Sequence, residues 1–93
     1  MTPRWAHSTA KHGIPRADQI YALVNATYKA RVEADSLDGG QVWLYIGPPH
    51  AQTDREIEIL VNVYEDRREA LVFHAMDLGP KCRRRREENP DGD

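Results

Sequence analysis

The sequence predicts an α+β domain: two N-terminal helices packed on a three- or four-stranded antiparallel sheet, followed by a short basic C-terminal helix or tail. Two patterns lead to this prediction. Apolar residues in the first third recur at three- and four-residue steps, the spacing of a helix face, whereas side chains in residues 41–46 and 56–63 alternate with a period of two, as in strands. Because short turns join consecutive strands, the sheet is expected to be antiparallel, with the helices on one face.

Proline and glycine mark the expected ends of the two helices. Thr2 and Pro3 form a good helix start and Gly13 a good stop, so a short helix anchored by Trp5 is predicted over residues 3–12. Pro15 opens a second, longer helix that ends near residue 27. The stripe expected to face the core in this helix consists of Ala17, Ile20, Tyr21, Val24 and Tyr28, widened by Leu23.

Two expected strands follow the second helix. Residues 28–33 alternate apolar and charged side chains, which fits an edge strand, with a frayed helix end as the alternative. Residues 35–40 have the composition of a turn. The next strand carries Val42, Leu44 and Ile46 on one face and aromatic side chains on the other, and Gly47 with two prolines ends it.

A hairpin over residues 56–76 is the centre of the predicted sheet. Its first strand has an apolar face made by Ile57, Ile59, Val61 and Val63, expected to face the helices together with Val42, Leu44 and Ile46. Residues 65–69 form a charged turn, and residues 70–75 return as the second strand. Strict alternation would place Leu71 and Phe73 on one face of that strand and Val72 and His74 on the other.

The overall composition is that of a single globular domain. The chain has 93 residues, 40% hydrophobic, with a net charge of −2. Residues 1–80 are expected to form the domain and residues 81–93 a charged C-terminal segment. There is no apolar run of the roughly 20 residues that span a bilayer and no secretory signal, so we expect a cytoplasmic protein without a membrane partner. A single Cys82 agrees with a reducing compartment.

Basic residues are concentrated near the C-terminus. Lys81 and residues 83–86, all arginine, provide five of the thirteen basic side chains, and acidic residues follow directly. Such a segment is either a solvated tail or a strip that binds phosphate groups.

No strong catalytic or metal-binding motif is present. His7 and His12 are five residues apart, which is a poor spacing for a shared metal ion, so neither a metal nor a cofactor is expected. His74 ends a strand shortly before the basic segment, and Lys11 with His12 forms a small cationic pair. Histidines and nearby cations are the groups that RNA cleavage through a 2′-hydroxyl requires, although each is also common in purely structural roles.

A resemblance to a known family adds to these observations. Trp5, the run Lys11-His12-Gly13-Ile14-Pro15 and the later Phe73-His74-Ala75-Met76 segment before basic residues are together similar to the BrnT-like toxins of type II toxin–antitoxin modules, within the RelE/ParE superfamily. The resemblance covers about residues 5–86. His74 and Met76 stand where the family has serine and arginine, and an arginine there would be a natural phosphate clamp.

The resemblance implies a ribonuclease toxin that inhibits translation by cleaving free or ribosome-associated RNA and is neutralised by a cognate antitoxin protein. The residues that would carry this activity are His74 and His12 as acid and base, with Lys11, Lys81, Arg83 and Arg84 as RNA contacts. Two alternatives remain open at this stage: a noncatalytic interaction protein that keeps the toxin fold and binds a protein or nucleic acid, and, within the superfamily, action on another target such as gyrase.

Overall fold

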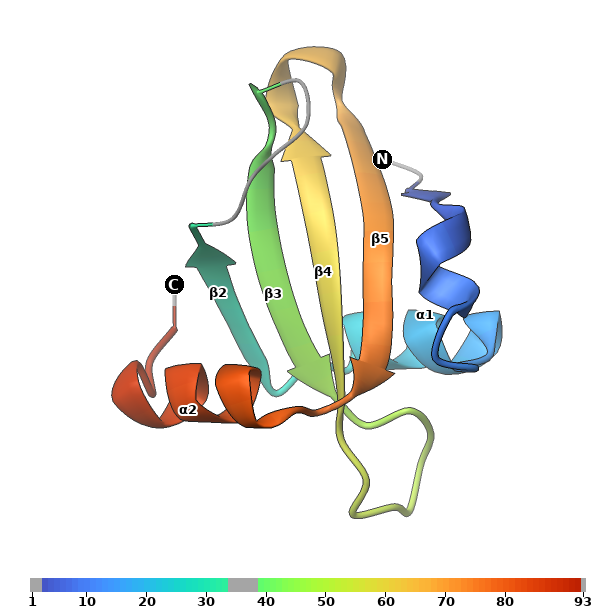
Figure 1. Ribbon diagram of the computed structural model, residues 1–93, viewed down its shortest axis with the longest axis vertical. Coiled ribbons are helices and arrows are strands. Elements are labelled where there is room, and N and C mark those ends of the chain that lie inside the picture. The colour runs from blue at the N-terminus through green and yellow to red at the C-terminus, as the bar shows by residue number, and fades with distance from the viewer. Residues whose placement is uncertain (1–2, 34–38, 93) are drawn as a thin grey trace.

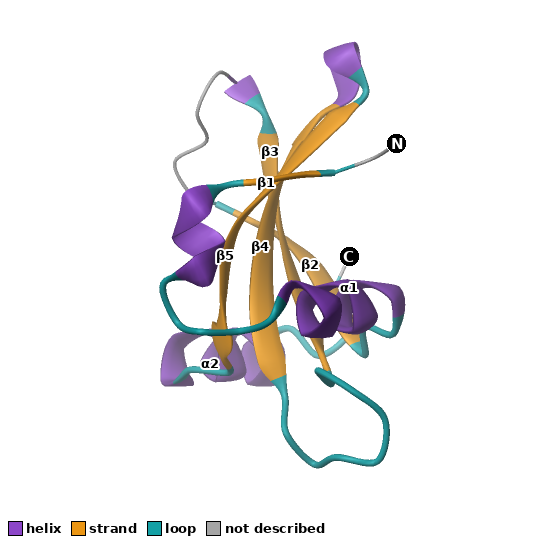
Figure 2. Ribbon diagram, turned by 90° about the vertical axis from the view of Figure 1, so that its right-hand side faces the viewer, coloured by secondary structure: helices purple, strands orange, loops and turns teal. Residues whose placement is uncertain are grey.

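The computed structural model describes residues 3–33 and 39–92, which form one five-stranded mixed sheet with a helix on each face (Figures 1 and 2). The strand order is β1-β5-β4-β3-β2. Along the chain the elements are β1 (Arg4–Trp5), the 3-10 helix η1 (His7–Ala10), α1 (Arg16–Val24), β2 (Tyr28–Val32), β3 (Gln41–Gly47), β4 (Ile57–Tyr64), the 3-10 turn η3 (Glu65–Arg67), β5 (Glu69–Asp77) and α2 (Pro80–Glu88). The predicted α+β class is confirmed, but the helices are not both N-terminal.

The prediction of a helix over residues 3–12 is wrong. Arg4 and Trp5 form β1, which pairs parallel with β5, and only the four residues of η1 are helical after it. The pairing places Trp5 beside Val72, where it packs on the core, and the Arg16 guanidinium lies 4.3 Å from the centre of its ring. A partner strand far away in the sequence therefore overrides the local helix signals, and it makes the sheet mixed instead of antiparallel.

The second predicted helix exists, but it packs through a different face from the one predicted. Gln19 and Ala22 are its buried residues, whereas Ile20 is 47% and Val24 78% exposed. The Gln19 amide donates to the Ile14 carbonyl oxygen over 2.9 Å, which ties the helix to the turn before it. The small Ala22 allows close approach to the sheet: a Cβ on Gly47 would lie only 2.6 Å from the Ala22 carbonyl oxygen.

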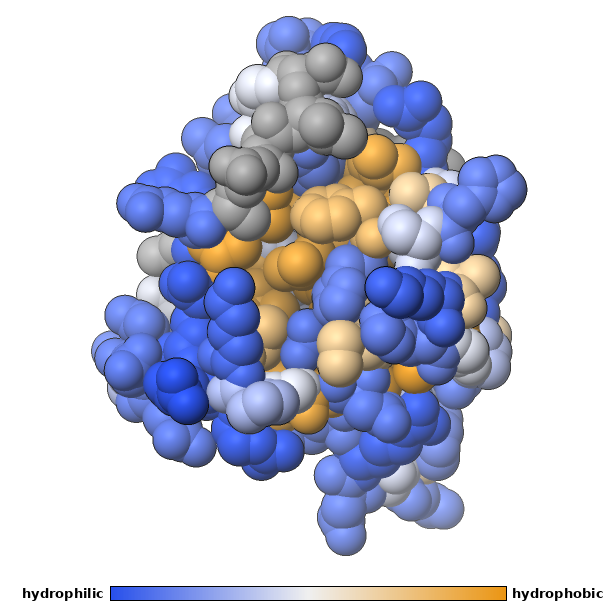
Figure 3. Space-filling model, in the orientation of Figure 1, coloured by the Kyte–Doolittle hydropathy of each residue, from blue (hydrophilic) through white to orange (hydrophobic). Residues whose placement is uncertain are grey.

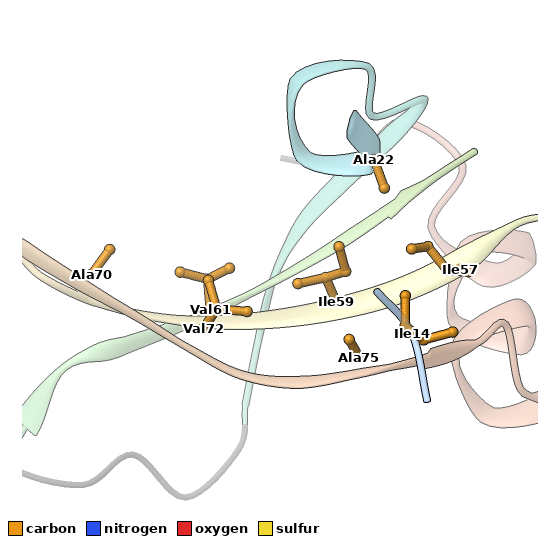
Figure 4. Packing of buried hydrophobic residues seen from close by; sticks show 8 residues of the cluster. All are labelled: Ile14, Ala22, Ile57, Ile59, Val61, Ala70, Val72 and Ala75. Atoms are coloured by element: carbon orange, nitrogen blue, oxygen red, sulfur yellow. The ribbon is translucent and has the colours of Figure 1, made fainter. Parts of the chain in front are cut away.

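The sheet has a hydrophobic core on both faces, and this corrects the predicted placement of the β3 residues. The β3–β4 register pairs Leu44 with Leu60 and Tyr45 with Ile59, so the apolar sets of the two strands face opposite ways. The α1 face is built from Ile14, Ala22, Ile57, Ile59, Val61, Ala70, Val72 and Ala75 (Figure 4). The α2 face is built from Tyr28, Ala30, Leu44 and Ile46, with Val32, Leu60, Leu78 and Cys82 partly buried against them.

A β-bulge in β5 breaks the alternation that the sequence predicts there. Leu60 pairs with His74 and the next residue, Val61, pairs with Val72, so Phe73 is the extra residue. Val72 consequently points to the α1 face with Val61, and His74 points to the α2 face with Leu60. The prediction that Val72 and His74 share a face is wrong for this reason.

Several other predictions are confirmed. Residues 28–32 form an edge strand, β3 alternates as expected, and the hairpin turn falls on the charged residues after Tyr64, with Arg68 in the left-handed conformation at φ 51°. The expected basic C-terminal helix is present as α2, with Gly79 as its N-cap and Pro80 as its first residue. Most of the predicted turn at residues 35–40 lies outside the described residues. Neither helix of the described chain has the length and apolar composition that a bilayer crossing requires.

Candidate functional site

A groove of about 270 Å³ lies between α2 and the exposed part of the sheet. Val32, Leu44 and Leu60 form an apolar floor. Polar and ionisable side chains surround this floor: Glu33, Glu58, His74, Lys81, Cys82 and Arg85. Figure 3 shows apolar side chains gathered over β3 and β4 and framed by hydrophilic residues. The groove therefore combines an apolar surface with acid–base groups and cations.

The bulge in β5 is what brings His74 into this groove. The Phe73 carbonyl oxygen, at the extra residue, accepts a hydrogen bond from the Ser8 hydroxyl, so η1 holds the bulge from the side of the sheet. Bulges commonly re-aim a side chain next to a functional site. The His74 side chain is 26% exposed, so it is accessible from solvent while its position is fixed by neighbours.

Glu58 is the buried charge of the site. It is 5% exposed and sits on β4, where its carboxylate accepts from His74 Nε2 over 2.9 Å and from the Gly79 backbone N–H over 2.8 Å. Burial by itself would raise the pKa of Glu58, but the hydrogen bonds from His74, Gly79 and Cys82 outweigh it, and the pKa lies below its ordinary value. Glu58 is therefore an ionised carboxylate at neutral pH.

The structure brings the two predicted catalytic histidines together. His12 follows η1, and its ring centre lies 5.8 Å from that of His74 with the ring planes at 76°. Figure 2 shows the chain from β1 to α1 passing along β5, which is how a residue near the N-terminus reaches the end of the last strand. Lys11, beside His12, is exposed.

The basic helix contributes unequally to the groove. Lys81 and Arg85 line it, whereas Arg83 and Arg84 are exposed and are not among its lining residues. Arg86 instead forms a bidentate pair with Glu56, with N–O distances of 2.5 and 3.1 Å. The hydrogen bond from Arg86 is the main reason that the pKa of Glu56 is lowered, and the pair fixes α2 against the start of β4.

Cys82 and Met76 both lie near Glu58 but offer little chemistry. Burial and the nearby Glu58 charge raise the pKa of the Cys82 thiol to about 12, so it is protonated and unsuited to act as a nucleophile. Met76 is the cross-strand partner of Glu58 and brings no charge. Arg85 is the groove residue that offers a guanidinium.

The described residues include no cluster of three or more His, Cys, Asp or Glu side chains that could hold a metal ion. The ionisable groups that line the groove are an imidazole, a thiol, carboxylates and cations. These can exchange protons and bind an anionic substrate.

The sequence pattern does not single out two residues of the groove, Glu58 and Arg85. Glu58 alternates with isoleucines, which is the pattern of a solvent-facing residue on a sheet with one buried face; only the second core on the α2 side makes it buried. Arg85 is one of four consecutive arginines. It lies four residues after Lys81, and residues four apart share a helix face, so this spacing is the signal that distinguishes it from the other three.

Comparisons with protein-family models, curated proteins and solved structures give no significant match to this chain. The similarity to the BrnT-like toxins therefore rests on the short motifs that surround His12 and His74.

Proposed function

We propose that this protein is a ribonuclease toxin of a type II toxin–antitoxin system, which inhibits translation by cleaving RNA through histidine acid–base chemistry. The observation that carries the proposal is the 5.8 Å approach of the His12 and His74 rings beside a groove lined by Lys81 and Arg85. Residues far apart in the sequence meet there: His12 lies in the run that resembles the Lys-His-Gly motif of the BrnT-like toxins, and His74 stands where those toxins have serine.

The chemistry needs only His74, which lines the groove, His12 beside it and the cations of α2. One imidazole takes the proton from a ribose 2′-hydroxyl, and the resulting oxygen attacks the adjacent phosphorus. The bond from phosphorus to the 5′-oxygen breaks, and the second imidazole, protonated beforehand, gives its proton to that leaving oxygen. The products are a 2′,3′-cyclic phosphate and a 5′-hydroxyl. Imidazole suits both steps because it exchanges protons near neutral pH.

Cations on α2 would bind the phosphate as negative charge develops. Lys81 and Arg85 line the groove in which His74 lies, so they are the principal candidates for this role. Lys11, Arg83 and Arg84 are exposed and available to contact the RNA backbone on either side of the cleaved bond. The N-terminus of α2 is not the phosphate site in this scheme, because the Glu58 carboxylate already accepts the Gly79 N–H there.

Purified protein tests the proposal directly. Wild type is expected to cleave a mixed RNA substrate, alone or with ribosomes, and to arrest growth when expressed. His12→Ala and His74→Ala are each expected to lower the cleavage rate by roughly 10²–10⁴-fold and to relieve the arrest. His12 is exposed, so its removal should leave the thermal midpoint near that of wild type.

His50→Ala is the matched control, because His50 is also exposed but lies in the loop before β4, whereas the His12 ring packs against that of His74. It should keep wild-type activity. The ribonuclease proposal fails if wild type leaves RNA intact under both conditions, or if His12→Ala is as active and as toxic as His50→Ala.

An interaction protein is the second candidate, and the α1 side of the sheet favours it. A shallow groove of about 410 Å³ lies there, with Leu23, Trp43, Tyr45 and Val61 among its lining residues, and Val24 on α1 is largely exposed. Such a surface fits a protein partner, including the cognate antitoxin expected of a toxin. A harmless wild type without RNA cleavage would select this candidate, and a small DNA-binding protein encoded next to the gene would favour the toxin.

A further inference from the structure

Glu58 makes contacts that a purely structural carboxylate on a strand does not need. It joins three elements at one point: its own strand β4, His74 on β5, and the N-cap residue of α2, Gly79, through the N–H of that residue. The carboxylate thereby links the predicted acid–base residue to the helix that carries Lys81 and Arg85. Any change in the position of Glu58 would move both His74 and α2.

The hydrogen bond also determines which nitrogen of His74 carries a proton. An ionised carboxylate can only accept hydrogen bonds, so the 2.9 Å contact requires a proton on His74 Nε2. In the neutral ring the other nitrogen, Nδ1, is then unprotonated and able to accept a proton. Without such a partner both tautomers of a neutral imidazole are accessible, and only one of them presents Nδ1 as a base.

We infer that Glu58 is a positioning residue that holds neutral His74 in the Nε2–H tautomer and so makes Nδ1 of His74 the general base of the reaction. This inference rests on the ribonuclease function proposed above and assigns the roles that it left open. Nδ1 takes the proton of the 2′-hydroxyl as the new oxygen–phosphorus bond forms, and His12, protonated, supplies the proton to the departing 5′-oxygen. The Glu58 carboxylate stabilises the His74 imidazolium that results.

The same contact explains how a carboxylate is accommodated in a nearly apolar position. Burying Glu58 is unfavourable unless its oxygens are hydrogen-bonded, and two of its donors, His74 Nε2 and the Gly79 N–H, belong to the site itself. The titratable and charged groups around the pair are His12 after η1, Glu33 after β2, and Lys81, Cys82 and Arg85 on α2. Among these the Cys82 thiol stays protonated, so it adds no charge near neutral pH.

The tautomer can be measured on the unmodified protein. Long-range ¹H–¹⁵N correlation spectra of ¹⁵N-labelled wild type, recorded well above the ordinary histidine pKa of about 6.5, show which ring nitrogen is protonated. The His74 signals are assigned by their loss in His74→Ala. We expect a proton on Nε2 alone. A proton on Nδ1, or an equal mixture of tautomers, would overturn the inference.

Kinetics supply the second measurement. Glu58→Gln removes the charge at nearly constant shape and is expected to lower kcat on the order of 10²-fold, to change KM little, and to alter the limb of the pH–rate profile that reports the base. Glu56→Gln is the matched control, because Glu56 also binds α2, through Arg86, but is not in contact with His74. It should keep both kcat and the pH profile.

The two proposals fail in different ways. Wild type that cleaves RNA with His74 protonated on Nδ1 would refute the role of Glu58 and keep the ribonuclease. Wild type that carries the proton on Nε2 but cleaves no RNA would refute the ribonuclease and keep the link between Glu58 and His74. An equal loss of kcat in Glu56→Gln and Glu58→Gln would show that anchoring α2, and not orienting His74, is what matters.

Discussion

Ile59→Ala tests the assignment of the principal core to the α1 face. Ile59 is fully buried in β4, among Ile57, Val61 and Ala75 (Figure 4). The substitution removes three buried carbon atoms, which at about 0.8 kcal/mol for each methylene gives roughly 2.4 kcal/mol for transfer to water. The cavity left beneath α1 adds to this, so we expect a loss of about 3 kcal/mol, inside the usual range of roughly 2–5 kcal/mol.

Val24→Ala is the contrasting variant. The sequence pattern predicts that Val24 is buried, but the structure leaves it 78% exposed on α1. Replacing it should change stability by no more than about 0.5 kcal/mol, because exposed sites cost little and alanine favours a helix.

Urea unfolding followed by circular dichroism measures both variants. With a slope of roughly 1–2 kcal/mol per molar for a protein of this size, a loss of 3 kcal/mol lowers the midpoint by about 1.5–3 M. This packing of α1 on the sheet would be refuted if Ile59→Ala lowered the free energy of unfolding by less than about 1 kcal/mol. It would also be refuted if Val24→Ala lowered it as much as Ile59→Ala does.

Three further predictions concern the charged groups. Folding lowers the pKa of Glu58 from 4.5, so its ionised form stabilises the wild-type protein above about pH 5. As the pH falls through the folded-state pKa this stabilisation is lost, and the urea midpoint of wild type should approach that of Glu58→Gln. If Lys81 and Arg85 contact phosphates, replacing both with serine should weaken the salt dependence of RNA binding. The slope of the logarithm of the association constant for single-stranded RNA against the logarithm of salt concentration should become shallower by about 1.4, and an unchanged slope would mean that neither residue contacts a phosphate. Because folding raises the pKa of Cys82 from 9.0 to about 12, alkylation by iodoacetamide at pH 8 should be roughly 10³-fold slower in folded than in unfolded protein, and equal rates would contradict this environment.

The elements that depend on local signals could be predicted from the sequence. Gly79 and Pro80 start α2 and the charged residues after Tyr64 turn the hairpin, because each acts through its own backbone conformation or the few residues around it. The sequence also points to His12 and His74 as candidate acid–base residues; the structure places their ring centres 5.8 Å apart, and their catalytic role stays a prediction.

Features set by distant partners could not be predicted in this way. The N-terminal segment has the composition of a helix start, yet Trp5 pairs with Val72 and the segment extends. The face of α1 was misassigned because Gln19 gains buried hydrogen bonds, to the Thr9 and Ile14 carbonyl oxygens, that no hydrophobicity pattern reveals. Glu58 looked like a surface residue because alternation alone does not tell whether one or both faces of a sheet are covered.

The bulge at Phe73 also bears on how the gene tolerates changes in length. Substituting Phe73 keeps the path of the backbone, whereas an in-frame deletion of its codon would restore strict alternation along β5. Either His74 would then turn away from Glu58, or Val72 would leave the core, since one residue more or less reverses the faces of a strand. Selection should therefore act more strongly on the number of residues in this strand than on the identity of residue 73.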